Sequence, residues 1–500
     1  MNTVRIVSAA FRLPAFFAIC FSSFLAAQIS SGAPPNILLI VADDLGYGDV
    51  ACFRDGVAWR TVKPAPPGTK PPATLHLDRL AKSGLMLTSF YANDAVCSPT
   101  RAALMTGRYQ HRTGVINVLG QLSEAMEQTA STGETPFTGL GADETTIAEL
   151  LQKAGYRTAC IGKWHLGEMS TQHPMDNGFD HFVGTTAGAG DNFAMRDQRG
   201  RSTFWRDREL AEASGEYYTD LLANEAIGFI RQPSDQPFFV YLPFTAPHVP
   251  YFAPGDRDLA WDGNEKGPRS DLHAAYAEVV EALDSAVGRV LQALEEEGLD
   301  RHTLVVFTSD NGPVDYGSAT PFRGRKTNLY EGGVRVPTIV SWPGVIKPGT
   351  QADAPAMSMD LFRTFAVAAE AEVPAELQLD GVDLTPLFSD EGRLPERSLF
   401  WERGVGVHMK QFHRRLAAIR RGNWKLVLPG PGKPPELYDL SNDPQERHSI
   451  ATDHSAVVAE MKAAFDAWRT DVYADCPYDP DELILRLRKA GIIAEQQPSS

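Results

Sequence analysis

The chain has 500 residues, of which 43% are hydrophobic and 22% are charged, a profile that excludes a disordered or fibrous protein. It is long enough to bury a large core and to form more than one lobe. Its 47 basic and 63 acidic residues give a formal net charge of −16. Such a charge repels polyanions at long range, so general nucleic-acid binding is excluded and an anionic substrate needs a locally basic pocket.

The N-terminal segment is typical of a secretory signal peptide. Residues 1–42 contain no acidic residue, carry Arg5 and Arg12, and include an apolar run from Leu13 to Ala27. A membrane anchor is the alternative, but this run is shorter than the about 20 residues that a span needs, and a proline and two serines interrupt it. We therefore predict that residues 1–27 are cleaved, and that the protein is periplasmic or secreted without stable membrane insertion.

Five short apolar runs predict strands that are buried on both faces of a parallel sheet, because polar and apolar residues do not alternate in them. Helical patterns lie between them, the clearest from Leu272 to Gly298, and this alternation indicates an α/β layered domain. Ligand sites in such sheets form beyond the carboxyl ends of the strands. The predicted strands are Asn36–Ala42, Arg157–Ile161, Phe238–Leu242, Leu304–Phe307 and Thr338–Ser341.

The pattern changes near residue 394. Leu416–Arg421 and Trp424–Leu428 flank Gly422-Asn423, a strong signal for a two-residue hairpin, which predicts a small antiparallel C-terminal lobe. We therefore expect three parts after the signal peptide, namely an α/β domain at 35–393, an antiparallel sheet with a helix at 394–480, and a tail at 481–500.

Acidic pairs follow two of the predicted strands. Asp43-Asp44 comes after the first strand, and Asp310-Asn311 comes after the strand near residue 306. Because these side chains offer only oxygen ligands, they favour Ca²⁺ or Mg²⁺ over zinc. Either pair alone is more often a simple turn sequence, but two pairs at equivalent places in the sheet favour a divalent metal site.

A helix N-terminus is predicted at Cys97 by the segment CSPTRAALMTGRY, with Ser98 as a cap and Pro99 in the first turn. Free amides and the helix dipole attract an anion there, and Arg101 adds a positive charge on about the same side. A lone cysteine is more often a small buried hydrophobe. The flanking residues, and the lack of a disulfide framework, nevertheless indicate a functional role for Cys97.

Further cations and proton donors follow other predicted strands. Lys163 and His165 lie in GKWHLG, His248 lies in PHVP, and Lys326 lies in the glycine-rich, basic loop GRKTNLYEGGVRVP. Each of these residues, taken singly, is more often structural or a solvated surface charge. Together with a metal site and a nucleophile position, they suit the transfer of a tetrahedral oxyanion such as sulfuryl or phosphoryl.

These motifs resemble those of the formylglycine-dependent sulfatases, a family with the alkaline-phosphatase-like fold. The Cys-x-Pro-x-Arg signature is present as Cys97, Pro99 and Arg101, and its Thr-Gly continuation as Thr106-Gly107. The resemblance extends from about Pro35 to the end of the C-terminal hairpin, with six motifs in family order. It implies a large, mixed, mostly parallel sheet between helices, and a small C-terminal antiparallel sheet.

The resemblance also implies a mechanism. A maturation enzyme would oxidise Cys97 to formylglycine, whose hydrate attacks sulfur beside a calcium ion, in preference to magnesium. Arg101 would polarise the hydrate, Lys163 and Lys326 would bind sulfate oxygens, His248 with Lys326 would protonate the leaving alcohol, and His165 would help to restore the aldehyde. The calcium ligands that match the family are Asp43, Asp44, Asp310, Asn311 and residue 97.

We therefore expect a sulfuric ester hydrolase that acts on a sulfated small molecule or saccharide. The alternatives are a phosphate or phosphonate monoester hydrolase of the same superfamily, a cysteine hydrolase that uses Cys97 with a histidine, and an inactive sugar-binding relative. Several other residues suit saccharide recognition and are explained equally well by solvation, loop structure or sheet packing: Asp191, Asn192, Trp401, His408, Lys410, His413, Arg414, Arg415 and Trp424.

Overall fold

The computed structural model describes residues 33–479 and residue 482, with gaps at 55, 120–138, 189, 197–199, 260, 262, 390–391, 404–415 and 431. The predicted signal peptide, the basic residues between 408 and 415, and all of the predicted tail except residue 482 lie outside this part of the chain. Export therefore stays a prediction. Within the described residues, no helix combines the length and the apolar character that crossing a bilayer requires.

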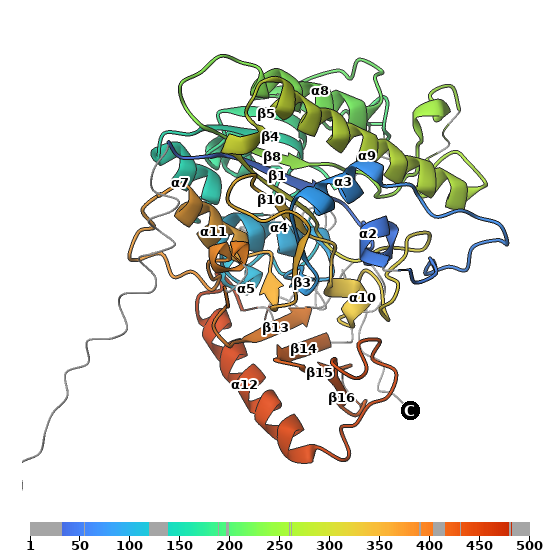
Figure 1. The fold of residues 1–500 in the computed structure, drawn as a ribbon, viewed down its shortest axis with the longest axis vertical. Coiled ribbons are helices and arrows are strands. Elements are labelled where there is room, and N and C mark those ends of the chain that lie inside the picture. The colour runs from blue at the N-terminus through green and yellow to red at the C-terminus, as the bar shows by residue number, and fades with distance from the viewer. Residues whose placement is uncertain are drawn as a thin grey trace, which may run out of the picture. The chain divides into compact units, whose positions relative to one another are not determined.

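A ten-stranded mixed sheet lies at the centre of the structure, and its five middle strands are parallel (Figure 1). Every residue of the central strand β1 is buried, as its unbroken apolar sequence predicts. The strands, in spatial order, are β11 (Thr350–Ala352), β2 (Leu85–Leu87), β10 (Ile339–Ser341), β9 (Thr303–Ser309), β1 (Asn36–Ala42), β8 (Phe238–Pro243), β4 (Arg157–Lys163), β5 (His181–Thr185), β6 (Phe204–Arg206) and β7 (Glu209–Leu210).

The five apolar runs all form strands of this sheet, and the predicted α/β fold class is confirmed. Strand β1 has the predicted bounds, while β4, β8 and β9 extend by one or two residues at their ends and β10 begins one residue later. The strands that the sequence did not predict are mostly short and lie toward the edges of the sheet. Two or three residues are too few to reveal a periodic pattern.

Helices cover both faces of the sheet. Helices α8 and α9 pack together on one face, and α4, α7 and α11 lie on the other (Figure 1). The predicted apolar stripe of α9 is buried at Ala275, Val279, Leu283 and Val287, and Gly298, at φ +68°, follows its end as predicted. The helices are α2 (Ala51–Arg54), α3 (Leu75–Ser83), α4 (Cys97–Thr106), α5 (Gln110–Thr113), α7 (Ile147–Lys153), α8 (Tyr218–Ile230), α9 (Leu272–Glu296), α10 (Glu331–Val334), α11 (Asp360–Ala368) and α12 (Ser455–Ala474).

Two smaller sheets complete the structure. Strands β3 (Phe90–Tyr91) and β12 (Ala356–Met357) form a parallel pair. The C-terminal residues form a four-stranded antiparallel sheet with α12 packed against it, and its central hairpin turns at Gly422 as predicted. The strands of this sheet are β13 (Ser398–Arg403), β14 (Leu416–Arg421), β15 (Trp424–Leu428) and β16 (Glu436–Asp439). A domain boundary at residue 393 stays a prediction.

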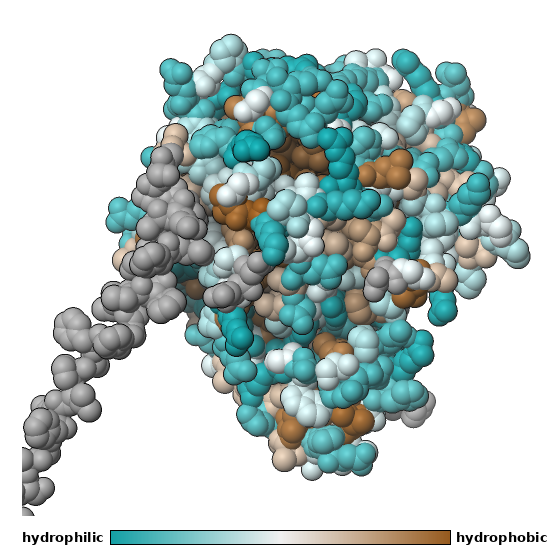
Figure 2. Space-filling model, in the orientation of Figure 1, coloured by the Kyte–Doolittle hydropathy of each residue, from teal (hydrophilic) through white to brown (hydrophobic). Residues whose placement is uncertain are grey.

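The C-terminal sheet joins the rest of the protein through buried contacts. Trp401 is fully buried, and its indole nitrogen donates to the carbonyl of Ala92 at 2.9 Å, so this ring is part of the core. The ring of Trp424 packs against His454. The face of the molecule shown in Figure 2 is mainly hydrophilic, with small apolar patches scattered over it, which is ordinary for a folded protein surface.

A buried ion cluster also connects this sheet to the chain that follows β9. The Nζ of Lys425 lies 2.8 Å from Glu331 Oε1 and 3.0 Å from Glu446 Oε1, and all three residues are fully buried. Burial alone would raise the pKa of Glu331, but Lys425 and two arginines hold it at about 2. Burial raises the pKa of Glu446 to about 7. Lys425 is therefore the shared counter-charge of two buried carboxyl groups.

Replacing this lysine should be costly. We expect Lys425→Met to lower the free energy of unfolding by about 3–5 kcal/mol, because it removes the cation that the two buried carboxyl groups share. Urea unfolding near neutral pH measures this loss. The matched control is Arg421→Met, which breaks an exposed ion pair with Glu460 and should cost no more than about 1 kcal/mol. Equal losses in the two variants would contradict the importance of the buried cluster.

Candidate active site

Two loops at the carboxyl edge of the sheet bring the predicted acidic residues together. Strands β1 and β9 are parallel neighbours in which Ala42 pairs with Ser309, so Asp43-Asp44 and Asp310-Asn311 begin side by side. All four side chains are buried. Asp44 has a left-handed backbone, at φ +66°, and its amide donates to Asp310 Oδ1 at 3.2 Å. The parallel sheet thus places the acidic residues as the sequence predicted.

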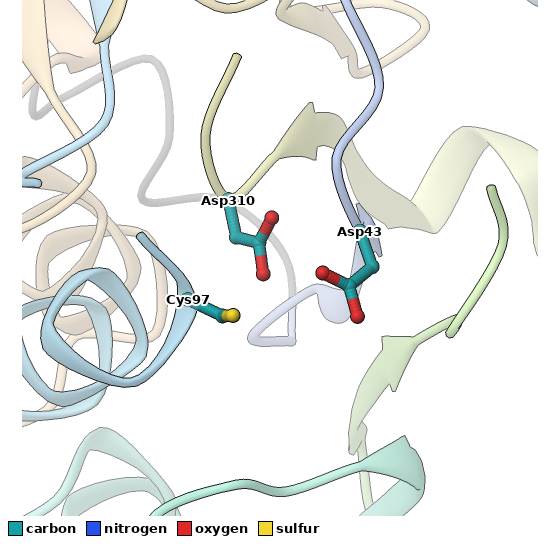
Figure 3. Close-up of side chains that lie close together, drawn as sticks. All are labelled: Asp43, Cys97 and Asp310. Carbon is teal, nitrogen blue, oxygen red and sulfur yellow. The ribbon is translucent and has the colours of Figure 1, made fainter. Parts of the chain in front are cut away.

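Cys97 lies opposite these carboxylates, at the first residue of α4. Its sulfur and one oxygen each of Asp43 and Asp310 lie within 4.8 Å of one another, and the three side chains point toward a common centre (Figure 3). The predicted cap was wrong, because Val96 occupies the N-cap position and the Ser98 hydroxyl accepts the amide of Leu119 at 3.1 Å. The predicted helix N-terminus at Cys97 is confirmed.

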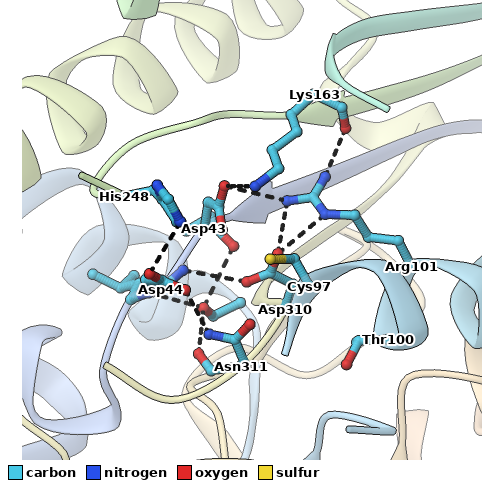
Figure 4. Close-up of polar contacts among 12 residues, drawn as sticks. Asp43, Asp44, Cys97, Thr100, Arg101, Lys163, His248, Asp310 and Asn311 are labelled. Carbon is cyan, nitrogen blue, oxygen red and sulfur yellow. Dashed lines mark hydrogen bonds and ion pairs between the residues drawn. The ribbon is translucent and has the colours of Figure 1, made fainter. Parts of the chain in front are cut away.

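Two buried cations approach the carboxylates from α4 and β4 (Figure 4). The Arg101 guanidinium donates to Asp310 Oδ2 at 2.8 Å and 3.1 Å, and to the carbonyl of Lys163 at 2.6 Å. The Nζ of Lys163 lies 2.5 Å from Asp43 Oδ2. Gly162, at φ +135°, is needed just before this lysine, because a Cβ there would lie 2.0 Å from the carbonyl oxygen of Pro243.

Lys326 supplies the third cation, from the loop that follows β9. Its Nζ lies 2.6 Å from Asp44 Oδ1 and 3.7 Å from Cys97 Sγ. Asp44 Oδ1 also accepts the side-chain amide of Asn311 at 2.7 Å. Lys326 is therefore the cation in direct contact with residue 97, a role that its sequence motif alone did not show.

The two predicted histidines differ in surroundings. The Nδ1–H of His248 donates to the carbonyl of Val249 at 2.6 Å, and its Nε2 lies 3.6 Å from Asp44 Oδ2 at a partly exposed position (Figure 4). His165 is buried, with a left-handed backbone at φ +57° and Nε2 3.2 Å from the carbonyl of Leu119. Its Nδ1 is buried without a hydrogen-bond partner among the described residues.

The charges of the site shape its titration. Burial alone would raise the pKa values of Asp43 and Asp44, but Lys163 and Lys326 respectively, together with His248, hold them below the ordinary range. Burial and the neighbouring Asp43 raise the pKa of Asp310. Burial also raises the pKa of the Cys97 thiol, so an unmodified thiol here is a poor nucleophile at neutral pH. This last shift argues against a cysteine hydrolase.

Three oxygens in the site have no hydrogen bond from any described residue. They are Asp43 Oδ1, Asp44 Oδ2 and Asn311 Oδ1, and all are buried. A buried acceptor without a partner costs about 1–3 kcal/mol, so three of them in one place favour a bound ligand. Carboxylate and carboxamide oxygens form the donor set that Ca²⁺ takes in proteins. These residues therefore fit the predicted divalent cation.

Other polar residues that the sequence singled out have local roles. The carboxylate of Asp191 accepts the backbone amides of Phe193 and Arg196, each at 3.0 Å, and the carbonyl of Asn192 accepts the amide of Tyr218. Both therefore shape their own loop. Sequence reasoning missed Tyr241, whose hydroxyl lies 3.4 Å from the Arg101 guanidinium, because a tyrosine inside an apolar strand gives no functional signal.

A cavity of about 290 Å³ lies elsewhere, between residues 57–62, residues 319–324 and the segment at residues 445–447. It contains none of the predicted site residues. The catalytic candidates therefore converge on the carboxyl edge of the sheet and not on this cavity.

Comparison with known proteins identifies the family. The sulfatase family matches residues 35–371, and the C-terminal domain of N-sulphoglucosamine sulphohydrolase matches residues 324–471. The chain belongs to the sulfatase family. It is 33% identical to the steryl-sulfatase of Mus musculus, with 91% of this chain and 84% of the relative covered. It is 35% identical to the N-acetylgalactosamine-6-sulfatase of Sus scrofa, with 74% and 69% covered.

The fold comparison agrees with the family assignment. The crystal structure of Ps i-CgsB in complex with k-i-k-neocarrahexaose matches this sulfatase with a TM-score of 0.75 and 29% identity, over 91% of this chain and 98% of that one. The protein is therefore an enzyme, a sulfuric ester hydrolase, and the expected fold is confirmed. The family assignment also sets aside the phosphatase and the sugar-binding alternatives.

His165 should stay neutral through the neutral pH range. Burial lowers its pKa well below the ordinary value, and the charges of Lys163 and Arg101 lower it further. A lowered pKa means that the ring binds its second proton only at lower pH, so the ring is neutral at pH 6.5, where an ordinary imidazole is about half protonated. Nitrogen NMR of histidine-labelled protein tests this expectation, and a His165 titration midpoint above the ordinary value would contradict it.

Proposed function

We propose that this sulfatase hydrolyses its ester through a formylglycine formed from Cys97, beside a calcium ion. One observation carries the proposal: buried carboxylates lie beside residue 97 at a helix N-terminus, and three oxygens of this acidic cluster have no hydrogen-bond partner among the described residues. Sγ occupies the position that the oxygens of a formylglycine hydrate would take. A maturation enzyme is then a necessary partner, because oxidation of a thiol to an aldehyde needs an external oxidant and catalyst.

The metal would be held by oxygens that already face one another. Asp43, Asp44, Asp310 and Asn311 are the protein ligands, and the modified residue 97 completes the set. Calcium at this place would polarise both a sulfate oxygen and the hydroxyl of residue 97. Arg101 fixes Asp310 through its guanidinium, so this ligand keeps its orientation when substrate enters.

The lysines and the helix N-terminus would bind the sulfate group. Lys163 Nζ and Lys326 Nζ each contact a carboxylate, at 2.5 Å and 2.6 Å, and either ammonium has further hydrogens that can reach a sulfate oxygen. Lys326 lies next to residue 97, so its charge acts where negative charge develops during attack on sulfur. The free amides at the start of α4 act in the same direction.

The histidines would move protons at two different places. His248 is partly exposed and faces Asp44 with Nε2, so it can give a proton to the departing alcohol at the mouth of the site. His165 is neutral and buried, and its unpartnered Nδ1 can accept the proton that leaves the second hydroxyl of residue 97. Burial lowers the pKa of both rings, which gives His165 its neutral, basic form near neutral pH. At His248 the negative charges of Asp43 and Asp44 oppose this shift and favour the protonated ring, the form that can give up a proton.

The aldehyde can be detected directly. In protein from its native host, we expect peptide mass spectrometry to find residue 97 with CHO in place of CH₂SH. Cys97→Ala should lower kcat for 4-nitrophenyl sulfate by at least about 10³-fold, because the nucleophile is lost. Cys476→Ala is the matched control, since this partly exposed cysteine lies outside the site, and it should retain full activity. An active enzyme that carries only free thiol at residue 97 would refute the proposal.

Calcium should affect stability as well as turnover. Removal by EGTA should lower the melting temperature by a few degrees, because a ligand at about 100 times its Kd stabilises the fold by about 2.7 kcal/mol. Asn311→Leu removes one unpartnered oxygen with little change of shape and should weaken calcium binding in isothermal titration. The control Asn442→Leu lies at an exposed turn and should bind calcium normally. If the melting temperature of the wild type is the same with calcium and with EGTA, the metal assignment is wrong.

A further inference from the structure

The residue after Lys326 has a strained backbone. Thr327 has φ +77°, in the left-handed region that β-branched residues avoid, and such a conformation costs about 1–3 kcal/mol. It persists only where surrounding contacts impose it. Because Lys326 is the cation in contact with residue 97, the backbone that directs its side chain is part of the site.

Three segments hold this strained turn in place. The amide of Lys326 donates to the carbonyl of Pro313, and the amide of Thr327 donates to the carbonyl of Ala95, each at 2.9 Å. The carbonyl of Thr327 accepts the Arg403 guanidinium at 2.8 Å. The first two partners lie in the segments that carry Asn311 and Cys97, whereas Arg403 comes from the C-terminal sheet.

Arg403 is itself firmly anchored. It is the last residue of β13, where the indole of Trp401 donates to the Ala92 carbonyl and the carbonyl of Glu402 lies 3.0 Å from His111 Nε2. The Phe400 amide also donates to the Tyr109 hydroxyl at 3.2 Å. Successive residues of this strand are thus attached to the segments on either side of Cys97. The guanidinium is therefore held at a fixed distance from the catalytic helix.

A buried carboxyl group accompanies this arginine. Asp94 lies three residues before Cys97 and is 2% exposed, and its Oδ1 has no hydrogen bond from any described residue. Burial raises the pKa of Asp94 to about 7, and the charge of Arg403 opposes this shift. Burial lowers the pKa of Arg403, while Asp94 and Cys97 oppose that change. The guanidinium thus acts electrostatically on both residues.

We propose that Arg403 is a positioning residue for the sulfatase reaction: its bond to the Thr327 carbonyl holds the left-handed turn that directs Lys326 toward Asp44 and residue 97. The inference rests on the function proposed above, because it assigns a partner to the lysine of that site. Arg403, from the C-terminal sheet, thereby sets the position of Lys326 without touching the substrate.

A double-mutant cycle separates positioning from general stability. We expect Arg403→Met to lower kcat/KM for 4-nitrophenyl sulfate by about 10- to 100-fold, the effect of a misplaced catalytic group. In the Lys326→Met background, the same change should cost less than about threefold, because the group that it positions is absent. Losses that multiply in the double variant would overturn the proposal.

Relief of the strain gives an independent test of the same idea. Glycine adopts φ +77° without a steric cost, so the turn no longer needs the arginine. Thr327→Gly alone should stay within about threefold of the wild type, and Thr327→Gly with Arg403→Met should recover about tenfold over Arg403→Met. If Arg403 has only a structural role, adding Thr327→Gly to Arg403→Met should not restore any activity.

The controls keep this test apart from the proposed function. Arg421→Met lies on the neighbouring strand β14 and should retain wild-type activity. Rates are normalised to the aldehyde content of each variant, so a defect in maturation is not counted. Wild-type turnover and the aldehyde test the function itself, whereas a crystal structure of Arg403→Met tests the inference without activity. We expect Thr327 to leave its positive φ and Lys326 Nζ to leave Asp44, and an unchanged turn would refute the proposal.

Discussion

Three buried carboxylates remain charged only where positive charge lies beside them, and the elements around the active site supply that charge. Asp43, Asp44 and Asp310 come from the ends of two parallel strands, and each meets a separate cation, from β4, from the loop after β9 and from α4. The six charges cancel. Under the proposed function, a divalent cation would find carboxylates whose charges are already balanced, and the negative sulfate group would find cations that need only share existing contacts.

Those contacts could be predicted where a single local rule fixes them. The ends of parallel strands share one edge, so the apolar runs placed Asp43 and Asp310 at the same edge of the sheet, and the helix pattern placed Arg101 on the side of Cys97. The Ser98 cap failed because the N-cap lies two residues earlier, at Val96, and the Ser98 hydroxyl instead accepts the amide of Leu119. Tyr241 and Arg403 could not be found, since their contacts depend on how distant segments dock.

The C-terminal sheet is more than a cover for the catalytic sheet. Lys425 neutralises Glu331, five residues beyond Lys326, and Trp401 bonds to the backbone of Ala92, five residues before Cys97. Both contacts are buried, so a change in either one would disturb the packing of the C-terminal sheet against the segments near the active site. The residues of one active site therefore depend on packing in two layers of the protein, which explains why no single stretch of sequence describes it.

The burial of Cys97 has a consequence for the order of events during biosynthesis. Its side chain is 2% exposed, and every residue of α4 is buried, so another enzyme cannot enclose this segment once the chain has folded. If residue 97 is converted to the aldehyde as proposed, the conversion has to precede folding, before this segment is buried. A chain that folds first would keep the thiol, and later addition of the maturation enzyme would not rescue it. The fraction of active enzyme in a host would then depend on the rate of oxidation relative to the rate of folding.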